Sequence, residues 1–365
     1  MAYSVALRAA SPLPLSESRS MKPRLLSSSA APFALAMASV LGCSSSSAAG
    51  APAVDGGLAD SEAFDVGIDT GTFEGGVVTT LASGQKNPGG IVVNARVVGW
   101  TTCTAPTSNL NGPGSLYALP LAGGAPRAIA TSADNGAELA IDDTSLYWAA
   151  PDDDAVVKVS LDGGSPVTLA RNLEGSPLTV AVDATSVYWS NGKSILEVPL
   201  AGGTPKTLAS ANLSDIAQQT NLAVTASGVY ATTATTVLKI PLAGGAPTTL
   251  ASSQAPSSIT ADAANVYWTN LGGNAPSAVM KVPVSGGTPV TLSMLPMLAV
   301  PVAIAVDATS VYWIEAMGDV KKVPIAGGPT IPLATAPDQP GGIAVDATSV
   351  YWTDTSGGNV YRTAK

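Results

Sequence analysis

The residue types that most often carry out catalysis near neutral pH are scarce in this chain. Its 365 residues include no histidine and only two cysteines, Cys43 and Cys103. Without histidine the chain lacks the usual general base, the imidazole metal ligand and the ordinary serine triad. Because no histidine can activate Cys103, we expect it to be an inert, small apolar residue rather than a nucleophile. We therefore predict no catalytic residue.

Three consecutive carboxylates, Asp152, Asp153 and Asp154, could ligate a calcium ion, because hard cations take several oxygen ligands. Successive residues rarely point at one ion, and the spacing is not that of an EF-hand, so a solvated acidic loop is the favoured interpretation. The glycines of the chain belong to hairpins rather than to a phosphate-binding loop between a strand and a helix. We predict no metal site and no cofactor.

The charge and composition of the chain narrow its class. The formal net charge is −9 at pH 7, and charged residues make up 12% of the chain. Binding to a phosphate backbone requires clustered Lys and Arg, so nucleic acid is excluded as a partner. The usage of Val, Thr, Tyr, Gly and Pro is typical of many short strands joined by tight turns.

Residues 1–42 have the pattern of a secretory signal peptide. A basic stretch precedes an apolar run that is interrupted by Ser and Pro, which makes it too short for a stable membrane span. Residues 1–20 add nothing to such a signal, which makes Met21 a candidate for the true start. Residues 43–74 are small, polar and acidic and show no hydrophobic periodicity, so they predict a flexible tether.

Residues 40–43 (VLGC) end this signal and resemble the lipobox of bacterial lipoproteins, in which an apolar and a small residue precede the cysteine that takes the lipid. Leu41 is less usual there than Ala or Ser. The resemblance implies lipidation of Cys43, which would leave Cys103 without a disulfide partner. An ordinary secretory signal cleaved nearby is the alternative. Ser44, by resemblance to bacterial sorting signals, implies the outer rather than the inner membrane.

From residue 75 onward one unit of about 40 residues recurs seven times, and each copy carries an aromatic pair and a Gly-Gly pair. The aromatic pair is clearest as Tyr312-Trp313 and is degenerate at Gly99-Trp100 and Tyr230-Ala231. A period near 40 with all-β patterning is typical of β-propellers. The Gly-Gly pairs begin at residues 75, 123, 163, 202, 244, 286 and 327.

Each unit divides into four strands. An apolar inner strand is followed by an Asp-Ala-Thr-Ser turn, a Ser-Val-Tyr-Trp strand, a third strand such as Val320–Pro324, and a Gly-Gly hairpin that leads to the outer strand. All six tryptophans fall at one repeat position. We therefore interpret them as core between the blades rather than as a sugar-stacking site.

The two ends of the repeat region complement each other. The last copy contains three strands, whereas the first recognisable element, Gly75–Ala82, matches a fourth strand alone. An N-terminal strand that completes the last blade would close the ring and remove two exposed edges. We predict an all-β, seven-bladed β-propeller with four-stranded blades over residues 75–365. Six blades are the alternative, if the degenerate copies at 91–130 or 222–252 do not form blades.

The unit resembles the YWTD-type and TolB-like propeller repeats, and the final copy contains Tyr351-Trp352-Thr353-Asp354 literally. Most copies lack the final Asp, seven repeats replace the six blades usual in the YWTD family, and no cysteine-rich module flanks them. The composition is similar to that of propeller lipoproteins from predatory soil bacteria such as myxobacteria. Comparable propeller enzymes, the quinone-dependent sugar dehydrogenases and streptogramin lyases, place histidine at their active sites, which this chain lacks.

Two sets of loops define the two faces of such a propeller. Loops between first and second and between third and fourth strands are nearly identical in every copy, and we call their side the constant face. Loops between second and third strands and between blades differ in every blade and form the variable face. Function concentrates in such loops, although drift of unconstrained loops is the alternative. The variable loops include Thr101–Gly114, which is polar and predicted to be mobile, Pro151–Asp154, Ala211–Asn221, Asn270–Ser277 and Ser293–Pro301.

The loop Ser293–Pro301 is apolar, and it predicts either a partner-docking patch or a plug over the central channel. Taken together, the sequence predicts a monomeric, non-enzymatic binding or scaffold module. A lipid alone would anchor it to the bacterial cell envelope, and its variable face would contact an envelope or extracellular protein, peptide or glycan. The alternative is a hydrolase or lyase that works with carboxylates and Ca²⁺. A deep channel with converging charged side chains would favour that enzyme, and a broad, partly apolar surface would favour binding.

Overall fold

The computed structural model describes residues 77–103, 114–133, 138–171, 173, 175–210, 221–252, 254–272, 276–335 and 339–365. Within these ranges the chain forms seven four-stranded antiparallel sheets, and no helix in them is long and apolar enough to cross a membrane. The predicted signal at 1–42, Cys43 and the tether at 43–74 lie outside the described residues.

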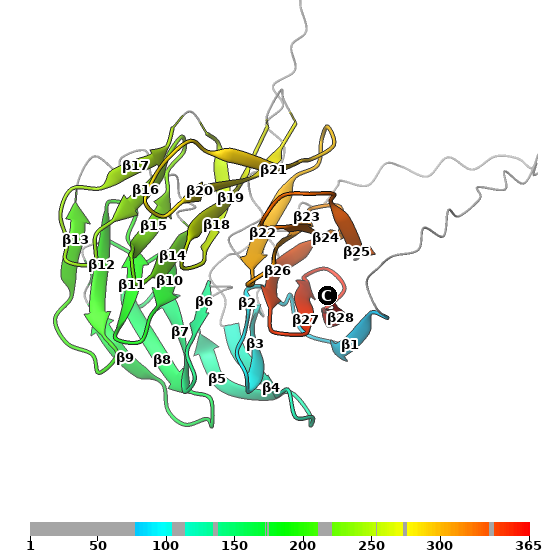
Figure 1. The fold of residues 1–365 in the computed structure, drawn as a ribbon. Helices are drawn as coiled ribbons and strands as arrows, with labels where there is room; N and C mark the ends of the chain where they lie inside the picture. The colour runs from blue at the N-terminus through cyan, green and yellow to red at the C-terminus, as the bar shows by residue number, and fades with distance from the viewer. Residues whose placement is uncertain are drawn as a thin grey trace, which may run out of the picture. The chain divides into compact units, whose positions relative to one another are not determined.

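Each sheet is one blade; in six of them the strands follow the order of the chain, and in the seventh β1 lies beside β28 (Figure 1). The first strand of each blade contacts the first strand of the next, and that of blade 7 contacts that of blade 1, so the blades form a closed ring. The strands are, in blade 1, β2 (Ile91–Val93), β3 (Val97–Cys103), β4 (Gly114–Pro120) and β5 (Arg127–Ala133); in blade 2, β6 (Leu139–Ile141), β7 (Ser145–Ala150), β8 (Ala155–Ser160) and β9 (Val167–Arg171); in blade 3, β10 (Thr179–Val182), β11 (Ser186–Ser190), β12 (Ser194–Pro199) and β13 (Lys206–Ser210); in blade 4, β14 (Leu222–Thr225), β15 (Gly228–Thr232), β16 (Val237–Ile240) and β17 (Thr248–Ala251); in blade 5, β18 (Pro256–Ala261), β19 (Asn265–Asn270), β20 (Ala278–Pro283) and β21 (Val290–Met294); in blade 6, β22 (Pro301–Val306), β23 (Ser310–Glu315), β24 (Asp319–Pro324) and β25 (Ile331–Thr335); and in blade 7, β26 (Pro340–Val345), β27 (Ser349–Asp354), β28 (Asn359–Ala364) and β1 (Thr79–Ala82).

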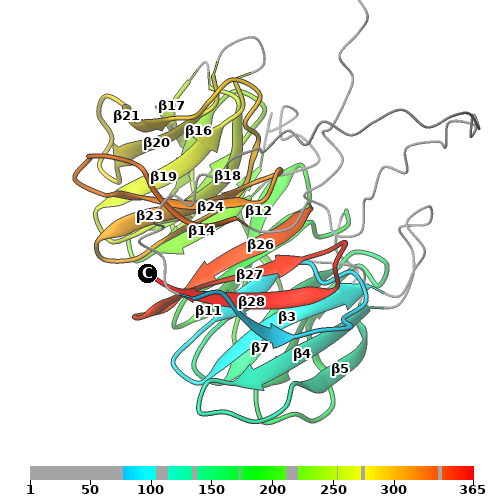
Figure 2. The same cartoon turned by 90° about the vertical axis from the view of Figure 1, so that its right-hand side faces the viewer.

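The N-terminal strand closes the ring, as predicted. β1 pairs antiparallel with β28, with Thr79 opposite Arg362 and Thr80 opposite Tyr361 (Figure 2). Both degenerate copies form complete blades, numbers 1 and 4, so the prediction of seven blades is confirmed and the six-bladed alternative is wrong. The hairpins between third and fourth strands use paired glycines with positive φ, 89° at Gly327 and 144° at Gly328, which a side chain would disfavour.

Seven hydrophobic clusters fill the seven interfaces between blades. The tyrosine of one blade and the tryptophan of the next share a cluster, as Tyr147 of blade 2 does with Trp189 of blade 3. Every tryptophan is at most 4% exposed, which confirms the core interpretation. Truncating such a residue to alanine typically costs about 3–5 kcal/mol.

Blades 1 and 4 depart from the Tyr-Trp pattern, and the neighbours of the small residues that replace the aromatic ones show why. Gly99 stands where blade 1 would carry the tyrosine, and a Cβ there would lie 2.9 Å from Leu146 of blade 2, which occupies the space. Ala231 stands where blade 4 would carry the tryptophan, and it packs with Tyr188 of blade 3. Both substitutions therefore replace large with small residues without opening the ring.

Candidate functional site

On the constant face, one aspartate in each regular blade holds the turn after the inner strand. In blade 7, Asp346 Oδ1 accepts hydrogen bonds from the main-chain N–H of Thr348 (2.7 Å) and Ser349 (2.8 Å), and Oδ2 accepts one from Tyr351 Oη (2.7 Å). Burial disfavours the ionised form, but these hydrogen bonds outweigh it and hold the pKa of Asp346 below its ordinary value. The equivalent pairs are Asp142–Tyr147, Asp183–Tyr188, Asp262–Tyr267 and Asp307–Tyr312.

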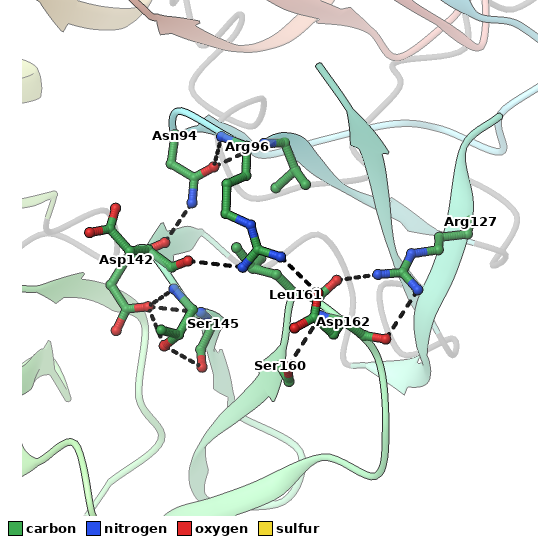
Figure 3. Close-up of polar contacts among 11 residues, drawn as sticks. Asn94, Arg96, Arg127, Asp142, Ser145, Ser160, Leu161 and Asp162 are labelled. Carbon is green, nitrogen blue, oxygen red and sulfur yellow. Dashed lines mark hydrogen bonds and ion pairs between the residues drawn. The ribbon is translucent and has the colours of Figure 1, made fainter. Parts of the chain in front are cut away.

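Further polar groups of the constant face join one blade to the next. Between blades 1 and 2, Asn94 Nδ2 donates to the main-chain oxygen of Asp142 (2.7 Å), Arg96 Nη2 pairs with Asp162 Oδ1 (2.8 Å), and Arg127 Nη1 donates to the main-chain oxygen of Asp162 (3.1 Å) (Figure 3). Asn94 occupies the repeat position of the turn aspartate. The polar side chains of this face therefore hold the fold together.

Cys103 ends β3, is fully buried, and is bonded through a disulfide. The expectation that it has no disulfide partner is therefore wrong. The only other cysteine of the sequence, Cys43, lies outside the described residues. One sulfur cannot carry a thioether-linked lipid and a disulfide at once, so these two states of Cys43 exclude each other.

Backbone strain among the described residues gathers on the variable face. Four residues other than glycine have positive φ: Asn87 (42°), Asp154 (46°), Leu298 (71°) and Gln339 (73°). All four lie in loops of the variable face. Asn and Asp tolerate this conformation, whereas Leu and Gln rarely adopt it, at a cost of about 1–2 kcal/mol. Strain of this kind clusters at functional sites, which directs attention to the loops around Leu298.

A group of exposed apolar side chains occurs in two neighbouring segments of this face, and we call it the apolar patch. It consists of Met294, Met297, Leu298 and Met317, whose exposed fractions are 60%, 60%, 84% and 74%. Met294 ends β21, and Met297 and Leu298 belong to the link from blade 5 to blade 6, in which Leu295 is buried, 3% exposed. Met317 belongs to the next hairpin.

A main-chain hydrogen bond joins the two parts of the apolar patch, from Ala316 N to Val300 O (2.8 Å). The predicted loop Ser293–Pro301 is shorter than expected, because Ser293 and Pro301 lie within strands β21 and β22. The exposure of its methionines and Leu298 favours the docking interpretation of this loop over the plug.

A buried ionic group supports the hairpin that presents Met317. Glu315 is 5% exposed, and its Oε1 accepts hydrogen bonds from Lys321 Nζ (2.9 Å) and Trp313 Nε1 (3.0 Å). Lys321 Nζ also pairs with Asp319 Oδ2 (2.9 Å). Burial disfavours the charge on Lys321, but the two carboxylates outweigh it and raise its pKa. These bonds therefore hold the hairpin that carries Met317 in one position.

Two buried indole N–H groups have no hydrogen-bond partner among the described residues, those of Trp189 and Trp352. In blade 7 the residue two positions after the tryptophan, Asp354, accepts from Gly357 N (2.8 Å) and caps its own turn instead of serving the indole. The literal YWTD aspartate is thus a turn residue here. Three other indole N–H groups donate hydrogen bonds to side chains: that of Trp100 to Gln85, that of Trp268 to Asn270 and that of Trp313 to Glu315.

One carboxyl on the variable-face side has a strongly shifted pKa. Glu138 immediately precedes β6, is partly buried, and accepts a hydrogen bond from Thr179 Oγ1 of blade 3. Burial raises the pKa of Glu138 to about 7, and the bond from Thr179 offsets this only in part. The sequence analysis did not single out Glu138. An alignment of the repeats would have done so, because the equivalent residues are Gly90, Thr179, Asn221, Ser258, Ala303 and Gly342.

The remaining predicted loops are only partly described. Asp152, Asp153 and Asp154 form an exposed turn, in which Asp154 Oδ1 accepts a hydrogen bond from Ser176 Oγ (3.2 Å). No group of three His, Cys, Asp or Glu side chains that could hold a metal occurs in the part of the chain that the structure describes. Of the loop Thr101–Gly114, the two ends belong to β3 and β4, and 104–113 lie outside the described residues, as do 211–220.

No protein-family model and no curated protein matches the sequence. Among solved structures, the chain is similar to virginiamycin B lyase from Staphylococcus aureus, with a TM-score of 0.65 and 14% identity over 79% of this chain and 98% of that one. It is also similar to YCF48 bound to D1 peptide, with a TM-score of 0.58 and 11% identity over 79% of this chain and 96% of that one. A third similar structure is the Cps50 (Swd1) β-propeller domain from Myceliophteria thermophila, with a TM-score of 0.59 and 10% identity over 80% of this chain and 99% of that one. These likenesses concern the fold. The chain is a seven-bladed β-propeller built from propeller repeats.

Proposed function

We propose that this protein is a non-enzymatic binding module of the bacterial cell envelope that contacts another protein through its variable face. The observation that carries the proposal is the apolar patch. Four large apolar side chains, one of them the strained Leu298, stand 60–84% exposed in segments held by buried groups. Exposed apolar side chains gathered at one place mark interaction sites in soluble proteins. The similar structure of YCF48 contains a bound peptide, which supports the use of this scaffold for peptide binding.

The likeness to a lyase does not favour lyase activity. A histidine-to-alanine variant of virginiamycin B lyase is described as catalytically inactive. This chain contains no histidine at all, so it cannot supply that residue. The shared feature is the scaffold, and unrelated functions are common on one scaffold.

Photo-crosslinking in cells tests which face binds. A photoreactive amino acid replaces Asp153, Lys193 or Gln254 on the variable face, and Asp162 or Ala264 on the constant face. We expect adducts with a partner protein from positions on the variable face only. Adducts that arise equally from both faces, or from the constant face alone, would refute the proposal.

We further propose that lipid on Cys43 holds the module at the envelope and that residues 43–74 act as its tether. The support is the resemblance of residues 40–43 to a lipobox. The Cys43→Ser variant is expected to leave the membrane fraction, and a variant that stays there contradicts the anchor. Mass spectrometry of the unreduced mature protein provides a second test. A disulfide that links Cys43 to Cys103 would exclude the lipid, whereas a diacylated Cys43 would require another thiol partner for Cys103.

A hydrolase or lyase that uses carboxylates is the second candidate, and Glu138 favours it. A carboxyl with a pKa of about 7 exchanges protons readily at neutral pH, as a general acid or base must. Turnover of chromogenic ester, phosphate and glycoside substrates by the wild type and by Glu138→Gln tests this candidate. An activity that the wild type shows and the variant loses would establish it over the binding module.

A further inference from the structure

We infer that the apolar patch binds an uncharged, apolar segment of a partner protein, one of whose main-chain carbonyls accepts a hydrogen bond from the indole of Trp352. This inference rests on the proposed function and names the chemistry of its partner. Its three supports are the neutral character of the patch, the orphan indole beside it, and the adaptable side chains that compose it.

The described loops that adjoin the patch offer no exposed, unpaired charge to a charged ligand. None of the described residues in the adjoining loops, 271–272, 276–277, 295–300, 316–318 and 355–358, is charged. Of the charged residues that flank these loops in sequence, Glu315 and Asp354 are buried and hydrogen-bonded, and Asp319 pairs with Lys321. An acidic chain with a neutral apolar patch is complementary to a neutral apolar ligand rather than to a basic one.

The orphan indole lies at the interface against which the hairpin of Met317 packs through Ala316. Trp352 packs against blade 6, in a cluster that includes Ile314 and, at its margin, Ala316. In the neighbouring repeat, Trp313 donates its indole N–H to Glu315 at the variable-face end of the interface, so the indole of Trp352 points to that end as well. A buried donor without an acceptor favours any ligand that supplies one.

The side chains above this donor can move aside without breaking the fold. Met317 is 74% exposed, and its hairpin neighbour Ala316 packs at the margin of the cluster that contains Trp352. Methionine is unbranched and fills irregular gaps, which suits it to a surface that adapts to its ligand. Leu298 is presented at the apex of its loop, 84% exposed, and supplies a fixed apolar anchor beside the flexible methionines.

A segment of another protein fits these features better than a second copy or a lipid surface. Each copy of the chain carries a net charge of −9, so two copies repel. Interfacial binding to membranes uses Lys and Arg beside the apolar residues, and the adjoining described loops carry none. A polypeptide offers both apolar side chains and the carbonyl acceptor that Trp352 lacks.

Selection from a random library of displayed 12-residue peptides tests the inference with the full-length mature protein. We expect the selected peptides to be apolar and uncharged, and their Kd to be measurable by fluorescence anisotropy. Leu298→Asp is expected to weaken binding roughly 10- to 100-fold, because it removes one buried apolar side chain and adds a charge. Trp352→Phe keeps a smaller aromatic ring, removes the N–H, and is expected to weaken binding about 5- to 10-fold.

Trp189→Phe is the matched control, because it removes the other orphan indole N–H, in blade 3, and should leave the Kd unchanged. Leu298 is on the surface, so Leu298→Asp is expected to fold. If Trp352→Phe does not fold, the Kd of Leu298→Asp still tests the inference. Selected peptides that are mainly charged, or a Kd that both patch variants leave unchanged, would overturn the inference. So would flotation of the unlipidated Cys43→Ser variant with phosphatidylcholine vesicles, or a dimer that Leu298→Asp dissociates in sedimentation. If crosslinks from the variable face persist under any of these results, the binding function stands and only the inference fails.

Discussion

Glu138 makes a pH-dependent contribution to stability whose sign follows from its burial. The carboxyl has its pKa raised from 4.5 to about 7 in the folded protein, so between these values the folded state holds a proton that the unfolded state has released. Stability therefore falls as pH rises through this window. One pKa unit corresponds to about 1.4 kcal/mol, so the full shift would correspond to about 3 kcal/mol. Because Glu138 is only partly buried, solvent screening reduces this to about 1–3 kcal/mol.

The test is Glu138→Gln, which keeps the shape and the hydrogen bond from Thr179 but cannot ionise. Urea unfolding of the wild type and the variant is measured at half-unit steps from pH 4.5 to 8.5. We expect equal stability near pH 4.5 and an advantage of about 1–3 kcal/mol for the variant above pH 7. The exposed Asp153→Asn is the control and should stay within about 0.5 kcal/mol throughout. A difference between Glu138→Gln and wild type that does not change with pH would refute the assignment.

Three further predictions concern the fold. Burial opposes ionisation of Asp307, but the Lys365 ammonium and main-chain N–H groups hold its pKa well below the ordinary range. Lys365→Met should therefore cost about 1–2 kcal/mol at pH 7 and progressively less below about pH 4, by urea unfolding. Tyr188→Phe, which loses a bond to a carboxylate, should cost about 1–2 kcal/mol, and Tyr230→Phe, whose partner is a threonine hydroxyl at 3.3 Å, about 0.5 kcal/mol, by thermal melting. Gly358→Ala should cost about 2–4 kcal/mol in the same assay, because φ is +68° and a Cβ would lie 2.5 Å from a main-chain oxygen of the link to β2. Costs near zero would contradict each assignment.

The architecture could be predicted from the sequence because its signals are local and repeated. A Gly-Gly pair after the third strand of a unit specifies a hairpin with positive φ, and a Tyr-Trp pair specifies a strand with both faces buried. Seven copies of each made the count robust, although blades 1 and 4 lack one aromatic residue each. The closure of the ring by β1 also followed from pattern alone, because Gly75–Ala82 matches a fourth strand and nothing else.

The candidate site could be predicted only in part. The apolar loop Ser293–Pro301 was recognisable by composition, but its two interpretations differ in exposure, which composition does not report. Met317 is a single methionine in a short hairpin, and only the hydrogen bond from Ala316 to Val300 joins it to the patch. The disulfide of Cys103 was missed, because the sequence argument assigned Cys43 to a lipid.

The sequence by itself determined the repeat, the strand order, the number of blades and the residues that form the core. These depend on backbone preference and on hydrophobic spacing within about 40 residues, which every copy restates. Tertiary structure alone decided the raised pKa of Glu138, the missing partner of Trp352 and the exposure of Leu298. The pKa of Glu138 depends on burial and on Thr179 of the next blade, which reaches it only when the ring closes. The other two depend on how a loop folds: Asp354 caps its own turn instead of serving the indole of Trp352, and the link between blades 5 and 6 leaves Leu298 exposed.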